Sequence, residues 1–565
     1  MFNPINNLIS ADNSERKNTV DNYNEKINSL LNLTDRVSIS NAFKDDQTEK
    51  KLIKINYLTQ DPSVMEPVIL EVSDKMIGKN LENDRLEVYD RNNPIALPDL
   101  EGNYLFESGS AHFDQVGSLA SASKTIEMLE RYRGSGINWA FGDSKLTIVP
   151  RKQEGKNAYY SRNSESANFF YFYSDPLKKT VQISESADVV SHELAHASLD
   201  GLRPNYLGWD LETTSFHEAF ADITSMLYAL ESKENIKKLF EENKGDFKKE
   251  SLISRLGEEF GKALHLEDDK PENDGQLFIR NMINDFKYVN PNSLPSSGSP
   301  DSLIAEPHSF SRVLSGAFYS LIEAVYNKNL ATNSDLQEAL IKTKDTVGKL
   351  LMRSIDNAPQ TKCKYKDFAI SMIKADKSLN NSDNYEEMKN IFLERKLITS
   401  SDLNNIKNFP LKGLEIKEDL KDPGTYEKFI NDNAKVFDLT EDTPLRTASI
   451  SFNEDGNITV GVIMTKEIQL KGSEFGKYEN CWVDVHGGVT LILDKNCKLL
   501  DIINDRIDEK KIKDVMNGLN NSIKKDLILE PFKSYFKDEN TMYEGICDHL
   551  ADGRKKIYRL PVIFN

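Results

Sequence analysis

Hydrophobic and polar residues alternate in short runs over the first hundred positions of the chain. Leu52–Leu58, Pro67–Val72 and Arg85–Tyr89 follow this pattern, between stretches rich in Asn, Asp and Lys. Short apolar or alternating runs bounded by polar turn residues are typical of β-strands. We therefore predict a β-rich N-terminal region of unknown role over residues 1–100.

From about Ser118 the apolar residues recur three and four positions apart, which predicts amphipathic helices. A first helix over Ser121–Arg133 ends at Gly134, and two strands with an aromatic stretch between them follow. These are Lys145–Val149, Asn157–Tyr160 and Asn168–Tyr173. Helical spacing then returns in Ala187–Asp200 (closed by Gly201), Thr213–Leu230, Leu252–Leu266, Ser309–Tyr326, Asp335–Ile355, Tyr365–Ala375 and Tyr385–Leu397.

The stretch Pro410–Pro423, with its glycines and charges, reads as a linker. Strand patterns and a helical pattern follow it: Arg446–Phe452, Asn457–Met464, Gly488–Leu493, Lys498–Ile503 and the helix Lys510–Leu527. The whole chain is thus predicted to be α+β, with one domain over residues 101–405 and a C-terminal α+β module over residues 411–565.

Composition narrows the class of protein. The 565 residues carry a net charge of −18, which disfavours nucleic acid as a partner. No apolar run approaches the ~18 residues that span a bilayer. The start of the chain lacks the basic and apolar stretches of a secretory signal, so we expect a protein that is cytoplasmic or exported without a classical signal. The four cysteines form no disulfide framework, and the oligomeric state stays open.

One predicted helix carries the sequence His192-Glu193-Leu194-Ala195-His196. Residues i and i+4 lie on one face of a helix, so both imidazoles point to one position and are able to hold one metal ion. Glu193 lies beside the first ligand, where its carboxylate reaches a water on the metal without binding the metal itself. One Zn²⁺ ion suits such a site best. The alternative is an ordinary helix with two partly exposed histidines.

The next predicted helix carries two acidic residues one turn apart, Glu218 and Asp222. They stand among Ala219, Phe220, Ala221 and Ile223, which is too apolar for a solvated acidic face. If this helix packs beside the first, Glu218 completes a site of two histidines and one glutamate. Asp222 is then placed to accept the Nδ1–H of a ligand imidazole.

The motifs His-Glu-Leu-Ala-His and His217-Glu218-Ala219-Phe220-Ala221-Asp222 resemble those of the thermolysin-like gluzincin metallopeptidases. The resemblance covers roughly Asn157–Tyr326. It implies a catalytic core with an edge-stranded sheet lobe and a mainly helical lobe. It also implies a zinc-dependent peptidase, acting as an endopeptidase on peptide or protein substrates, with Glu193 as the general base.

The resemblance implies further roles. Asn157, Ala158 and Tyr159 match the family's edge strand, whose backbone pairs with the substrate. Tyr206 and His308 match the two groups that stabilise the oxyanion, and His217 takes a position where the family often has Asn. A neutral imidazole there is still able to accept a proton from a ligand histidine. Arg203 and Arg312 are candidates for the family's substrate-clamping arginine by proximity alone.

Two other functions remain open at this stage. The first is a catalytically silent zinc-containing module that binds or supports other parts. The second is a gluzincin aminopeptidase of narrow specificity, although the chain has no Gly-x-Met-Glu-Asn run to hold a free N-terminus. Nucleotide-binding loops and a serine-hydrolase elbow are absent from the sequence, which argues against those enzyme classes.

Overall fold

The structure is a computed structural model of the chain. It describes residues 37–40, 51–206, 210–267, 278–333, 335–407, 414–437, 439, 444–529, 545–550 and 552–559. These residues form a mixed α+β fold, as the sequence predicts. Residues 1–36 and 41–50 of the predicted N-terminal region, and residues 410–413 of the predicted linker, lie outside the described residues.

A sheet of four strands in the order β4-β5-β7-β6 lies beside two β-hairpins in the first lobe. Within the described chain β6 pairs with β7 alone, so it is an edge strand. The hairpins are β2–β3 and β8–β9, both antiparallel. The strands of this lobe are β2 (Leu52–Tyr57), β3 (Val68–Ser73), β4 (Leu86–Val88), β5 (Leu146–Val149), β6 (Ala158–Ser161), β7 (Ser166–Phe169), β8 (Tyr171–Ser174) and β9 (Lys179–Gln182).

The helix α3 (Ala111–Arg133) packs behind these strands and ends at Gly134, in the left-handed conformation that glycine favours. It begins ten residues before the predicted start, because Ser110 caps it by accepting the Phe113 N–H. One apolar cluster joins this helix to the strands on both sides of it in sequence. Residues 52–104 therefore share a core with the residues that follow them, and the domain boundary near residue 100 stays a prediction.

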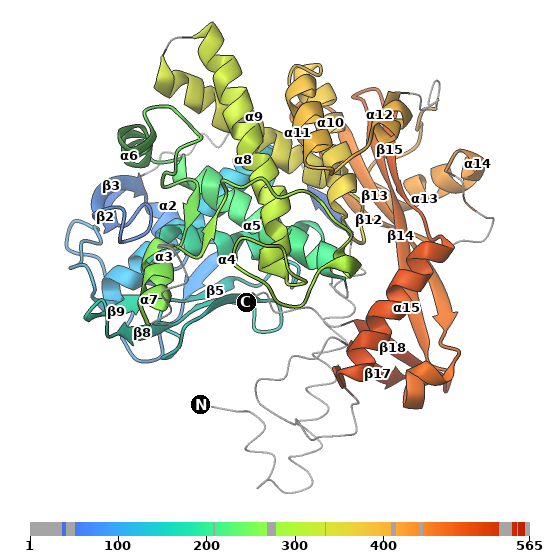
Figure 1. The fold of residues 1–565 in the computed structure, drawn as a ribbon, viewed down its shortest axis with the longest axis horizontal. Coiled ribbons are helices and arrows are strands. Elements are labelled where there is room, and N and C mark those ends of the chain that lie inside the picture. Colours follow the sequence, from blue (N-terminus) through green and yellow to red (C-terminus); the bar gives the residue numbers. More distant parts are fainter. Residues whose placement is uncertain are drawn as a thin grey trace, which may run out of the picture.

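The second lobe is mainly helical, and its helix α5 packs against both α4 and α8 (Figure 1). A continuous apolar core runs through this lobe. Its helices are α4 (Ala187–Leu202), α5 (Leu211–Ala229), α6 (Lys233–Asn243), α8 (Pro307–Thr332), α9 (Leu336–Asn357), α10 (Tyr365–Asn380), α11 (Tyr385–Glu394) and α12 (Ser400–Lys407). The helix α7 (Glu258–Glu267) packs on the first lobe, where Phe260 and Ala263 join the apolar cluster of the strands.

Two local predictions in this lobe were wrong. The predicted helix Leu252–Leu266 is divided into the short strand β10 (Arg255–Leu256), which pairs with β11 (Arg280–Asn281), and the helix α7. Gly257 separates them with φ +63°, a left-handed value that breaks a regular helix. Gly201 lies inside α4 instead of ending it, and a Cβ there would lie 2.0 Å from the Asn138 carbonyl oxygen. This glycine thus permits a close approach between backbones.

The C-terminal module is a second sheet, on the right of Figure 1, in the order β1-β12-β13-β14-β18-β17-β16, with β15 paired to β14. Its edge strand β1 (Ser38–Ser40) comes from the predicted N-terminal region and pairs in parallel with β12. The other elements are β12 (Leu445–Phe452), β13 (Ile458–Gln469), β14 (Trp482–Leu493), β15 (Leu499–Asp505), β16 (Ile528–Leu529), β17 (Gly545–His549) and β18 (Lys555–Arg559), with helices α13 (Pro423–Asp432), α14 (Ala434–Phe437) and α15 (Glu509–Lys524).

The short helix α2 (Asp74–Ile77) follows β3. No helix among the described residues combines the length and the apolar character needed to span a bilayer.

Candidate metal centre

The helix α4 presents His192 and His196 on one face, as their spacing predicts. Both side chains are buried, and their Nε2 atoms are 3.2 Å apart. The first turn of α4 is held from two sides. The Ser225 hydroxyl of α5 donates to the Asp188 carbonyl oxygen (2.8 Å), and the Gly257 N–H donates to the Asp188 carboxylate (2.9 Å). The two imidazoles therefore belong to a firmly anchored helix.

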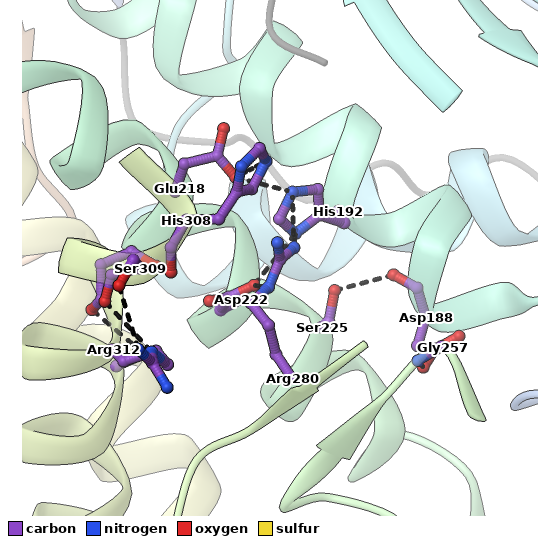
Figure 2. A network of polar contacts seen from close by, with 12 residues as sticks. Asp188, His192, Glu218, Asp222, Ser225, Gly257, Arg280, His308, Ser309 and Arg312 are labelled. Carbon is purple, nitrogen blue, oxygen red and sulfur yellow. Dashed lines mark hydrogen bonds and ion pairs between the residues drawn. The ribbon is translucent and has the colours of Figure 1, made fainter. Parts of the chain in front are cut away.

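The helix α5 brings Glu218 to the same point. Asp210 caps this helix by accepting the Thr213 N–H at 2.9 Å. Glu218 Oε2 lies 3.3 Å from His192 Nε2, and Oε1 lies 3.6 Å from His196 Nε2. The ligand atoms of the three residues lie within 4.8 Å of one another. Figure 2 shows Glu218 and His192 directed at each other across the two helices.

The spacing of these atoms fits a zinc ion. Ligand atoms bound at ~2.0–2.1 Å in a tetrahedron lie about 3.3–3.4 Å apart. The two separations at His192 Nε2, 3.2 Å to His196 Nε2 and 3.3 Å to Glu218 Oε2, are close to that value, and the 3.6 Å separation joins His196 Nε2 to the other carboxylate oxygen, Oε1. Two imidazole nitrogens and one carboxylate are also the donor set of catalytic zinc sites that keep a fourth position for water or substrate. The residues present therefore fit the predicted ion.

Charge at the centre is balanced by neighbours. Burial raises the pKa of Glu218, but the nearby His308 and His196 outweigh it and hold that pKa well below its usual range. Burial holds the pKa of His196 well below its usual range. For His192 burial also lowers the pKa, but the carboxylates of Asp222 and Glu218 raise it to about 9. Glu218 is thus ionised in the folded protein, and its negative charge favours a cation at the candidate centre.

Asp222 lies where the sequence analysis placed it. Its Oδ1 is 3.3 Å from His192 Nδ1 and 2.9 Å from Arg280 Nε. A carboxylate at the second nitrogen of a ligand histidine fixes the orientation of the ring. Arg280, on β11, was missed by the sequence analysis, because no motif marks it and its approach to Asp222 is a tertiary contact. Figure 2 shows it reaching Asp222 and His192.

His308 stands at the rim of the centre, in the first turn of α8. Its Nε2 is 3.2 Å from Glu218 Oε2, and its Nδ1 is 2.5 Å from Glu306 Oε1. Glu306 also caps α8 by accepting the backbone N–H of His308 and Ser309. The His308 side chain is 36% exposed, so it is accessible from solvent while its contact with Glu306 holds its orientation.

Glu193 lies beside the ligands with a buried carboxyl group. Burial raises its pKa to about 7. The Tyr160 backbone N–H donates to this carboxyl, whereas its Oε2 has no hydrogen-bond partner among the described residues. An unpartnered buried carboxylate oxygen is costly unless something absent from the chain binds there. The buried carboxyl of Glu193 thus lies beside the metal-ligand candidates with its pKa raised into the neutral range.

The stretch Asn157, Ala158 and Tyr159 leads into and forms part of the edge strand β6. Alternate residues of a strand direct their backbone groups to opposite sides. The Phe170 N–H donates to the Asn157 carbonyl oxygen on the β7 side, whereas the Tyr160 N–H faces Glu193. Ala158 therefore shares the open side with Tyr160, so the free edge of β6 faces the candidate centre.

His217 packs against a ligand instead of standing apart from the site. Its ring stacks on that of His196 with centroids 5.7 Å apart. Burial lowers the pKa of His217 to about 4, so it is neutral at physiological pH. A neutral ring agrees with the predicted acceptor role, which itself stays a prediction.

Three other candidates are bound elsewhere. Tyr206 is buried and its hydroxyl donates to the Pro359 carbonyl oxygen (2.7 Å), so the predicted oxyanion contact is not supported. The guanidinium of Arg203 donates to the Leu202 and Ile355 carbonyl oxygens. Arg312 donates to those of Pro300 and Ser302. The contacts of Arg203 join the ends of α4 and α9, and those of Arg312 hold the loop before α8. Among the described residues neither arginine forms a hydrogen bond or ion pair with the three ligands, whereas Arg280 lies beside His192.

No protein-family model matches the sequence, and no curated protein matches it either. The assignment of a function therefore depends on the geometry of the centre.

Proposed function

We propose that the protein is a zinc-dependent peptidase of the thermolysin-like type, and that it acts as an endopeptidase. One observation carries the proposal. His192, His196 and Glu218 converge closely enough to bind one zinc ion, and they lie beside Glu193, whose buried carboxyl has one oxygen without a hydrogen-bond partner among the described residues. A structural zinc site is usually closed by four protein ligands, whereas this set has three. A set with an adjacent base suits hydrolysis.

His192, His196 and Glu218 would hold the zinc ion, which when bound acidifies water and polarises a carbonyl group. Glu193 accepts the proton of the attacking water and passes it to the nitrogen of the leaving amine. Its pKa of about 7 allows it to perform both transfers near neutral pH. Asp222 and Arg280 keep the His192 ring in place while Glu193 gains and releases its proton.

His308 supplies a hydrogen-bond donor at the exposed side of the candidate centre. Its Nδ1 is held by Glu306, so Nε2 is the nitrogen directed at the centre. Both carboxylates raise the pKa of His308 against the opposing effect of burial, which favours the protonated ring. A proton on Nε2 stabilises the negative oxygen that forms on the attacked carbonyl, an effect worth ~10²–10³ in rate for one donor.

The free edge of β6 supplies a binding surface for an extended peptide. An edge strand binds a peptide through main-chain hydrogen bonds, with little dependence on side chains. Because this edge faces Glu193, a peptide paired to Ala158 passes directly over the metal ligands. A peptide held along its backbone is bound without recognition of its ends, which favours internal cleavage over removal of one terminal residue.

The variant Glu193→Gln tests the proposal. It keeps the three ligands but removes the base, so we expect wild-type zinc content and a loss of turnover of roughly 10²–10⁴-fold. Zinc is measured by elemental analysis and cleavage by mass spectrometry of a peptide library.

The matched control is Glu212→Gln. Glu212 is also buried on α5 with its pKa raised by burial to about 7, but it binds the Tyr365 N–H instead of facing the ligands. We expect this control to retain cleavage. Zinc-loaded wild-type protein that cleaves no library peptide would falsify the peptidase and leave a silent zinc module.

A further inference from the structure

A buried ion pair joins the edge strand β6 to the helix α4, next to Glu193. Arg162 directly follows β6, and its Nε donates to Asp200 Oδ2 at 2.7 Å while Nη2 contacts Oδ1. The side chains of Arg162 and Asp200 are only 1% and 5% exposed. Asp200 lies on α4, one helical turn after the ligand His196.

Two more hydrogen bonds extend this pair. The Tyr160 hydroxyl of β6 donates to Asp200 Oδ2 (2.8 Å), and Arg162 Nη2 donates to the Pro204 carbonyl oxygen (2.8 Å). The same Tyr160 donates its backbone N–H to Glu193. One residue of β6 is thus held at its side chain by Asp200 and at its backbone by Glu193, both on α4.

The arrangement is unusual for a device that only stabilises the fold. A buried ion pair loses much of its Coulomb energy to desolvation, and apolar residues of similar size often stabilise a protein equally well. What a forked, charge-assisted pair provides is a defined geometry. Here the geometry concerns an edge strand, which has a neighbouring strand on one side alone among the described residues.

We propose that Arg162, Asp200 and Tyr160 are positioning residues that set the distance between the free edge of β6 and the helix carrying the metal ligands. They hold the strand where a substrate peptide paired to Ala158 has its cleaved bond over Glu193. The inference rests on the proposed function. It adds that affinity for extended peptides, through β6, depends on this buried network and not on the ligands.

The test compares Arg162→Lys with Arg133→Lys. A lysine keeps the charge but cannot fork to Asp200 and also reach Pro204. Arg133 is the matched control, because it forms a similarly buried pair with Asp356 (side chains 5% and 3% exposed) that involves no residue of β6. Both variants lose a buried arginine–carboxylate ion pair with at least two hydrogen bonds, so a general loss of stability affects both.

Hydrogen exchange is the readout that does not depend on activity. We expect the backbone amides of residues 157–162 to exchange at least about fivefold faster in Arg162→Lys than in wild type, because β6 is released from α4. In Arg133→Lys the same amides should exchange at the wild-type rate. Equal exchange in all three proteins would overturn the inference.

Kinetics with two peptide lengths gives the second readout. Three-residue and six-residue blocked peptides that share one cleavage site are compared, and the longer one reaches further along β6. In Arg162→Lys the ratio of kcat/KM for the long over the short peptide should fall about fivefold to tenfold, the value of one or two backbone hydrogen bonds. A purely structural loss lowers both values equally, and this outcome would contradict the positioning role.

Two further results keep the inferences separate. If Arg162→Lys does not fold, Tyr160→Phe removes the hydroxyl bond to Asp200 alone, and the same changes are expected at smaller size. If wild type cleaves neither peptide but Arg162→Lys accelerates exchange in β6, the proposed peptidase fails while the link between β6 and α4 is supported. Cleavage by wild type with an unchanged length ratio in both variants overturns the positioning role and keeps the peptidase.

Discussion

Asp222 shows how one residue serves the candidate centre without being a ligand. Its carboxylate oxygen Oδ1 contacts both the His192 ring and the Arg280 guanidinium. The arginine limits the negative charge near the ligands, and the carboxylate makes His192 a better donor to a metal. The side chain is fully buried, so water cannot replace it in either contact.

We expect Asp222→Asn to weaken zinc binding about 10–100-fold while the fold is preserved, because an amide orients the ring but no longer offers a charge. The affinity is measured by competition with a chromophoric chelator, with Glu212→Gln as the control. An unchanged zinc affinity in Asp222→Asn would show that Arg280 and the helices alone orient His192.

At the scale of elements, buried carboxyl groups connect the beginnings of α4 and α7. Asp61 accepts the Glu259 N–H of α7 (3.0 Å) and the Ser186 hydroxyl before α4 (2.8 Å). Asp188 accepts the Gly257 N–H (2.9 Å). Burial, with the nearby charges of Asp61 and Asp188, raises the pKa of Glu258 to about 9. Glu258 is therefore protonated in the folded protein at neutral pH.

This protonation makes stability depend on pH. The folded state retains a proton that the unfolded chain releases near pH 4.5, so the stabilisation is complete below that pH and is lost as the pH rises towards 9. Glu258→Gln removes the dependence. We expect it to match wild type at pH 5 and to be more stable by about 1–3 kcal/mol at pH 9.

Denaturant unfolding at both pH values measures this difference, with Glu241→Gln on the exposed side of α6 as the control. The control should show no pH-dependent gain. If Glu258→Gln is equally stable relative to wild type at both pH values, Glu258 is ionised in the folded protein and its charge is compensated in another way.

At the scale of the whole molecule, the segment between α9 and α10 connects the helical lobe to the C-terminal sheet. On one side Pro359 accepts the Tyr206 hydroxyl. On the other side the Thr490 hydroxyl of β14 donates to the Ala358 carbonyl oxygen (3.1 Å), and Gln360 lies against Gly461 of β13. Tyr206 is thus buried where the helical lobe meets the C-terminal sheet, and its hydroxyl serves this contact instead of the metal centre.

Gly461→Val tests the contact. A Cβ at this position would lie 2.0 Å from Gln360 Cδ, so the buried glutamine must move and the sheet must separate from the segment. We expect a loss of about 1–3 kcal/mol in unfolding free energy, as is typical of overpacking. Ser449→Ala, which removes a single 3.2 Å contact with Gln360, should cost less. A valine variant as stable as wild type would mean that the two parts are not closely packed here.

Local patterns in the sequence were sufficient for most elements and for the first part of the site. In most helices and strands the apolar residues recur with periods of 3.6 and 2 residues. These periods involve only residues close in sequence, so the elements could be predicted from the sequence alone. His192 and His196 share a face because of helix geometry alone. Glu218 required one further assumption, that two consecutive helices pack together, and the apolar residues around it indicated this. These parts of the protein were determined by the sequence itself.

Only the tertiary structure decided the remaining features, since each depends on contacts between distant parts of the chain. Arg280 reaches Asp222 from a strand that no pattern marks, and Tyr206 is turned to Pro359. Gly201 lies within α4 against the Asn138 backbone, and residues 38–40 join the C-terminal sheet. The periodicity of a segment shows which face it buries but not which partner covers that face, and this partner decides where loop residues point.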